Sequence, residues 1–276
     1  MQKPISLLVV GFLATCSLSA CGAQQAERHD LNVVFVSGSN EYFSHISLPD
    51  YEQYLEGNFD HLNVTLLQAE GDLNEREEYS ELPGVEALEE ADVALFFSRR
   101  LTVDGEQLDH LKRYVDGGGG VVALRTASHG FQNWLEFDKD VLGGNYNGHY
   151  EGSSEGTIIY EEGNRLPDGE PTGPTTRVVV NPAFADHPVL AGVTDFESRY
   201  SLYKTSPVAH DVEVLMTGTI PDGGPEPVVW IRQHDGGRVV YIAQGGLQDF
   251  ENPTFRQLVT NALRWAAGEN DVSPRS

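Results

Sequence analysis

The chain has 276 residues, of which 39% are hydrophobic and 22% are charged. This composition supports a buried core and excludes a wholly disordered or fibrous protein. The 42 acidic residues outnumber the 18 basic ones, and the resulting net charge of −24 repels nucleic-acid phosphates, so we expect no nucleic-acid partner.

The first 20 residues resemble the signal peptide of a bacterial lipoprotein. Lys3 gives a positive start, residues 5–15 are apolar but too short to span a bilayer comfortably, and the sequence LSAC ends at Cys21. This pattern implies that residues 1–20 are removed and that Cys21 is acylated, which would anchor the protein to a membrane of the cell envelope. A secretory signal cleaved nearby is the alternative. Residues 21–30 would form a tether.

Cysteine usage restricts the chemistry of the expected mature protein. Cys16 and Cys21 are the only cysteines of the sequence, and both belong to the signal and its lipidation position. The body of the protein therefore has no disulfide, no thiolate ligand and no thiol nucleophile. Catalysis would have to use hydroxyl, imidazole or carboxylate groups, or a metal held by nitrogen and oxygen.

From residue 31 onward, apolar strands alternate with helical patterns. Strands are expected at residues 31–36, 62–67, 92–97 and 121–124. A helix is expected from near Thr102 to the glycines at 117–120, because Leu108, Leu111 and Val115 fall on one face. Shorter helices are expected at residues 48–55 and 85–88. This order is typical of a doubly wound sheet.

The second half of the chain begins with a Gly-, Ser-, Glu- and Pro-rich stretch at about residues 145–174. We interpret it as an excursion over the sheet with one strand at 157–160, because it has too few apolar residues for a second core. Strands are then expected at residues 177–180, 212–216, 228–231 and 239–243. Asn252 and Pro253 begin a last helix that ends before Gly268. Residues 31–268 thus form one domain, and residues 269–276 a frayed tail.

Polar residues follow several of the expected strands at their carboxyl ends. Ligands of an open parallel sheet bind beyond these ends, where loops converge. Arg125 is the most informative, because it continues an apolar strand and needs either a carboxylate partner, for which Glu41 is the candidate, or an anionic or polar ligand. The candidate rim residues are Glu41, Tyr42, His45, Arg100, Arg125, Ser128, His129 and Gln244.

Several longer motifs resemble the trehalose-utilisation (ThuA-like) family over residues 31–268. They are VFVSGSNEYFSH, ADVALFFSRR, VVALRTASHGFQNW, VLGGNYNGHY and GRVVYIAQGGLQDFENPTFRQLVTNALRWAAG, in this order. The resemblance implies a fold similar to class I glutamine amidotransferases, which is a flavodoxin-like, doubly wound, mostly parallel sheet with helices on both faces. It also implies a link to disaccharides and their 3-keto derivatives.

The chain departs from the related patterns at two places. The amidotransferase fold has a cysteine at the turn from strand to helix, and the family commonly has a histidine there, whereas this chain aligns Arg125. Glutaminase activity is therefore not expected. Many relatives end the last strand with Leu-Gly-His, and Gln244-Gly245-Gly246 stands in its place here, which puts the relatives' activity in doubt for this chain.

Two functions follow as hypotheses. The first is an enzyme (hydrolase, lyase or isomerase) acting on a sugar or keto-sugar, with His129 as general acid or base, Glu41 as its carboxylate counterpart and Arg125 stabilising developing charge. His149 could reach the same rim from the excursion. The second is a lipid-anchored protein that binds a carbohydrate without turnover. The aromatic candidates for stacking on a sugar ring are Tyr42, Phe43, Trp134 and Tyr146.

A metal site is a weaker third hypothesis. His45, His129, His149 and Glu41 are suitable nitrogen and oxygen ligands, but they are dispersed and no HExxH motif is present. We therefore expect neither a metal nor another cofactor. His187 precedes Pro188, and in the family's pattern this pair is structural.

Overall fold

The computed structural model describes residues 30–72, 78–150, 157–161, 164–168 and 175–270. The expected signal peptide, Cys21 and most of the tether and tail lie outside these residues. In the part of the chain that the structure describes, no helix combines the length and apolarity needed to cross a membrane.

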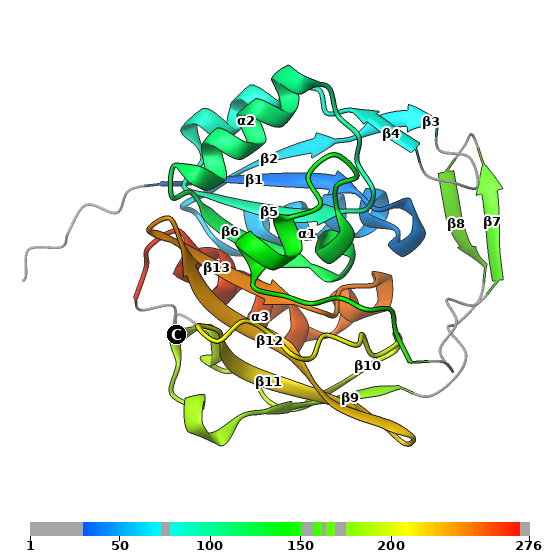
Figure 1. Cartoon of the computed structure of the whole chain (residues 1–276), viewed down its shortest axis with the longest axis vertical. Helices are drawn as coiled ribbons and strands as arrows, with labels where there is room; N and C mark the ends of the chain where they lie inside the picture. Colours follow the sequence, from blue (N-terminus) through cyan, green and yellow to red (C-terminus); the bar gives the residue numbers. More distant parts are fainter. Residues whose placement is uncertain (1–29, 73–77, 151–156, 162–163, 169–174, 271–276) are drawn as a thin grey trace, which may run out of the picture.

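The described residues form one large central sheet of nine strands, in the order β10-β9-β11-β12-β13-β6-β5-β1-β2 (Figure 1). The strands whose neighbours run parallel are β1 (Leu31–Gly38), β2 (Leu62–Gln68), β5 (Val93–Ser98), β6 (Gly120–Leu124) and, on its β6 side, β13 (Gly237–Ile242). The antiparallel strands are β12 (Gly223–His234), β11 (Glu213–Ile220), β9 (Thr176–Val180) and β10 (Phe196–Ser198). The expectation of a mostly parallel sheet therefore describes only half of it.

Helices are fewer than strands in the described residues and are mostly short. The α-helices are α1 (Ser44–Asn58), α2 (Gly105–Asp116) and α3 (Pro253–Ala266). The 3-10 helices are η1 (Asn40–Tyr42), η2 (Val85–Glu90), η3 (Arg125–His129), η5 (Pro182–Phe184), η6 (Pro188–Leu190) and η7 (Leu247–Glu251), and η4 (Phe137–Leu142) is a π-helix. The last helix begins as expected, since the Asn252 side chain accepts a hydrogen bond from the Thr254 backbone at 2.9 Å.

Both faces of the parallel half are covered, so β5 and β6 are buried throughout, and every residue of the two strands except Ser98 is apolar or glycine. Phe35 of β1 stacks on Tyr51 of α1, and the Tyr51 hydroxyl lies 2.8 Å from that of Thr260 in α3, so these two helices share one face. Phe96 of β5 is paired with Val36, the residue after Phe35 in β1. Because side chains alternate along a strand, Phe96 points to the other face of the sheet, where it packs on Phe137 of η4.

Two small two-stranded ribbons are separate from the main sheet. β3 (Glu70–Asp72) pairs with β4 (Glu78–Glu81), and β7 (Thr157–Glu161) pairs with β8 (Asn164–Asp168). The expected strand of the excursion is thus present as β7, but its partner is β8 and not the main sheet, beside which the ribbon lies (Figure 1).

Candidate functional site

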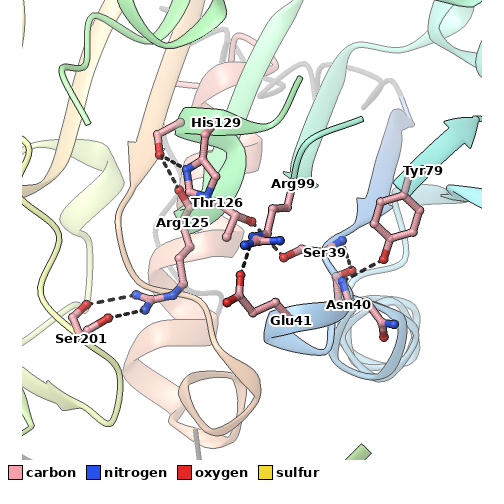
Figure 2. A network of polar contacts seen from close by, with 11 residues as sticks. Ser39, Asn40, Glu41, Tyr79, Arg99, Arg125, Thr126, His129 and Ser201 are labelled. Atoms are coloured by element: carbon pink, nitrogen blue, oxygen red, sulfur yellow. Dashed lines mark hydrogen bonds and ion pairs between the residues drawn. The ribbon is translucent and has the colours of Figure 1, made fainter. Parts of the chain in front are cut away.

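The carboxyl ends of three neighbouring parallel strands bring polar side chains together (Figure 2). Glu41, after β1, makes an ion pair with Arg99, which follows β5. Thr126, after β6, donates a hydrogen bond to the hydroxyl of Ser39 at 3.0 Å. The clustering that the strand order predicts is therefore present, although its internal pairing differs from the expectation.

Arg125 is the main correction. Its side chain is fully buried, and its guanidinium points to Ser201 (Figure 2). The guanidinium donates to the Ser201 hydroxyl at 2.9 Å, to the Ser201 carbonyl at 3.2 Å and to the Ala243 carbonyl at 3.3 Å. Glu41 is consequently not its partner, and Arg125 cannot contact a ligand from this position.

Aromatic side chains complete the environment of Arg125. Its guanidinium carbon lies 4.1, 4.5 and 5.3 Å from the ring centres of Tyr42, Tyr203 and Tyr200. Cation–π attraction to these rings offsets part of the cost of burying the charge. The cage brings together three segments that are distant in the sequence. Arg125 therefore supports the rim residues from the interior of the protein. Tyr42, expected to contact substrate, belongs to this cage.

Arg99, and not the expected Arg100, provides the positive charge at the rim. The side chain of Arg100 is exposed, while its backbone nitrogen donates to the His129 carbonyl at 3.0 Å. Arg100 has a φ of 56°, in the left-handed region, and this turn of the chain separates the directions of the two side chains. The charged pair of the rim is therefore Glu41 with Arg99.

His129 lies at the edge of this cluster. Its ring stacks on that of Tyr146, with centres 4.6 Å apart and planes 19° apart. Burial, together with the positive charges of Arg99, Arg100 and Arg125, lowers the pKa of His129 from 6.5 to about 3. The imidazole is therefore neutral at neutral pH. One ring nitrogen donates a hydrogen bond and the other accepts one, but the ring is a poor general acid because it lacks the second proton of the imidazolium.

A pocket of about 260 Å³ opens beside His129. The polar residues that line it include Ser128, His129, Asp138, Asn145 and Tyr146, and its apolar wall includes Phe131, Trp134 and Leu135. Of the residues expected at the site, Ser128 and His129 are thus part of the pocket, together with the aromatic candidates Trp134 and Tyr146. Asp138 and Asn145 were missed, because no strand end precedes them in the sequence.

The remaining expected residues lie apart from this pocket. His45 is half-buried in the first turn of α1, near the ring of Phe43. His149 is exposed, and Gln244 is fully buried after β13. His187 accepts a hydrogen bond from the Val189 backbone at 3.2 Å, in agreement with the structural role expected for it.

The residues considered for a metal do not form a ligand set. Within the described ranges, the group of three potential ligands that does lie close together is Asp116, His234 and Asp235. It belongs to the end of α2 and the turn between β12 and β13, not to the rim described above.

Fold and site together define an α/β protein with a cluster of polar side chains at the carboxyl ends of its parallel strands. The chain belongs to the ThuA family, described as trehalose utilisation, whose model matches residues 32–266. The family expected from the sequence is therefore confirmed.

Solved structures share this fold at low sequence identity. A ThuA-like protein from Bacteroides uniformis is 19% identical, with a TM-score of 0.59 over 92% of this chain and 98% of that one. A ThuA-like protein from Parabacteroides merdae is 18% identical, with a TM-score of 0.62 over 89% and 92%. The IFT52 N-terminal domain is 13% identical, with a TM-score of 0.54 over 87% and 98%. No curated protein sequence matches the chain.

Proposed function

We propose that this protein acts on a sugar or keto-sugar at the rim of the sheet, as a hydrolase, lyase or isomerase. The family's description supports a disaccharide or a derivative as the source of that sugar. The observation that carries the proposal is the closeness of the Glu41–Arg99 pair to His129 and Tyr146, because the charge of Arg99 acts on both rings and that of Glu41 on Tyr146. The two stacked rings line the pocket. An aromatic surface with polar groups at its edge suits a sugar ring, which has apolar faces and hydroxyl edges.

The rim residues divide the chemical work in this proposal. Glu41 is the carboxylate that takes or returns a proton, and Arg99 orients it and stabilises negative charge on a ligand oxygen. His129 forms a hydrogen bond with a ligand hydroxyl. Arg125 fixes the strand ends on which these groups stand. The arginine at the turn after β6 also takes the place of the cysteine that glutaminase chemistry requires, so we propose no glutaminase activity.

Replacing Glu41 with glutamine tests this assignment. The variant keeps the size of the side chain but removes the proton acceptor and the ion pair with Arg99. We expect kcat/KM for trehalose or its 3-keto derivative to fall by about 100-fold or more, the usual effect of losing an acid–base group, with an unchanged melting temperature. Glu56→Gln, on an exposed part of α1, is the matched control. Equal turnover by both variants would refute the role of Glu41.

Binding without turnover is the second candidate function. It is favoured by the two positions where catalytic groups were expected, because Arg125 is buried and the neutral His129, with its pKa lowered to about 3, is a weak base and a poor general acid at neutral pH. Calorimetry and product analysis on the same sample separate the candidates. Heat of binding with intact sugar after long incubation identifies a binding protein, whereas new products identify an enzyme.

We further propose that the protein is a lipoprotein of the bacterial cell envelope, anchored through Cys21. The pattern of residues 1–21 supports this. Cys21→Ser is expected to abolish acylation and to move the protein from the membrane fraction to the soluble fraction, or to leave the signal uncleaved. Mass spectrometry of the N-terminus checks both outcomes. An unmodified native N-terminus downstream of residue 21 would contradict the proposal.

A further inference from the structure

A half-buried carboxyl group, that of Asp138, lies at the wall of the candidate pocket. Asp138 belongs to the π-helix η4, a rare conformation that is frequent at functional sites. Its Oδ2 accepts a hydrogen bond from the backbone nitrogen of Tyr146 at 2.9 Å. Its Oδ1 is buried and has no hydrogen-bond partner among the described residues. The Asp138 carboxyl group therefore holds the segment that follows η4, residues 143–146, by this hydrogen bond.

The backbone of residues 143–146 passes close to the Asp138 carboxyl group. A Cβ at Gly144 would lie 2.2 Å from Oδ1, so a side chain there would push the two apart. The backbone nitrogen of Gly144 also donates to the Asp138 carbonyl at 2.9 Å. Two residues later the ring of Tyr146 stacks on His129, and all four residues line the same pocket. A continuous line of contacts thus runs from Asp138 through Tyr146 to His129.

We propose that Asp138 is a positioning residue of the sugar site, which holds Tyr146 against His129 so that the two rings form one wall of the pocket. The inference rests on the proposed function for the identity of the ligand. It adds a residue that the rim alone does not contain, because η4 lies beyond the strand ends.

The charge of Asp138 modulates this contact. Burial raises its pKa to about 6, and the Tyr146 hydrogen bond opposes the shift. A charged carboxylate accepts hydrogen bonds more strongly than a protonated one, so Tyr146 is held more firmly above pH 6. The titratable and charged groups around the Asp138 carboxyl group are His129 of η3, Tyr146, Tyr241 of β13, Arg232 of β12 and the exposed Lys139. The Arg232 guanidinium donates a hydrogen bond to the Asp140 carbonyl.

The raised pKa also predicts that the test variant folds. The folded protein holds this proton more tightly than the unfolded chain, whose carboxyl has its ordinary pKa of 3.8. The stability that this proton contributes is complete below pH 3.8 and is lost as the pH rises through 6. Asp138→Asn keeps an oxygen for the Tyr146 N–H and carries no charge, so we expect it not to weaken the fold at pH 7.

The experiment compares Asp138→Asn and Asp138→Ala with the wild type, and with Asp140→Asn as an exposed control in the same helix. In the wild type and the control, the Tyr146 amide proton is expected to shift downfield with a midpoint near pH 6. Trehalose affinity is expected to rise about three- to tenfold over the same range. Asp138→Asn should bind with a flat pH profile, and Asp138→Ala should lose at least about tenfold in affinity, as expected when a buried N–H is left unpaired.

Each outcome decides the inference. A Tyr146 amide that does not titrate near pH 6, or that titrates equally in Asp138→Asn, would overturn it. So would an Asp138→Ala variant with wild-type affinity for trehalose. Trehalose and 3-keto-trehalose binding to none of the proteins, together with the expected titration of the Tyr146 amide, would instead refute the proposed sugar function. The contact between Asp138 and Tyr146 would then stand without its ligand.

Discussion

Arg125→Ala is expected to lower the free energy of unfolding by about 3–5 kcal/mol, the usual cost of truncating a large, fully buried side chain. The change leaves the Ser201 and Ala243 carbonyls without their donor and empties a fully buried volume between three tyrosine rings. Urea unfolding followed by tryptophan fluorescence measures the loss. Arg125→Lys should recover only part of it, because an ammonium cannot replace the forked geometry of the guanidinium.

Arg113→Ala is the control for this experiment. Arg113 is 60% exposed on α2, 4.0 Å from Glu89, so its removal should change the stability by less than about 0.5 kcal/mol. Equal effects of the two substitutions would show that the tyrosine cage does not hold the strand ends. Sugar affinity should fall in Arg125→Ala as well, since the rim residues stand on the loops that Arg125 joins.

The contrast between Arg125 and the residues around it shows what a sequence can predict about this site. The position of Arg125 at a strand end follows from the apolar run before it. Its burial does not, because the rings that enclose it come from Tyr42 and from Tyr200 and Tyr203, which are far away in the chain. Local patterns place a residue on an element, whereas contacts between distant segments decide whether its side chain reaches the solvent.

Neighbouring residues raise the same difficulty on a smaller scale. Arg99 and Arg100 are chemically equivalent in the sequence, and the positive φ of Arg100 decides which of them faces Glu41. Asp138 was missed for a related reason. Residues 137–142 follow no expected strand, and the spacing of Phe137 and Val141 fits any short helical turn, so it does not indicate a π-helix that brings Asp138 to the pocket.

The strand positions were predicted better than their directions. The nine strand ranges expected from apolar runs are all found, within a few residues except for the much longer β12, but the second half of the sheet is antiparallel. A signal for this was present. Asp235 and Gly236 form a two-residue connection between β12 and β13, with φ values of 48° and 88°. Such a turn joins only antiparallel neighbours, so the dipeptide predicts the hairpin.

The final helix gives the second large expected effect. Leu258 is fully buried on the face of α3 that packs against β5, β6 and β13. Leu258→Asp removes about 2–5 kcal/mol of packing and adds the cost of a buried charge without a partner, which together match the whole stability of a typical domain. We therefore expect an unfolded or aggregated variant, detected as a loss of the cooperative thermal transition in circular dichroism.

Gln257→Asp is the control for Leu258→Asp. It tests whether the loss of stability comes from burying the new charge or from placing a charge anywhere in α3. Gln257 is half-buried one position earlier and makes one hydrogen bond, to Asn261 at 2.7 Å, so its replacement should cost only about 1 kcal/mol. The helix itself begins with a proline after an asparagine cap, and neither variant changes these signals. A Leu258→Asp protein that melts at the wild-type temperature would mean that this face of α3 does not carry the core, and the strand ends would then need another support.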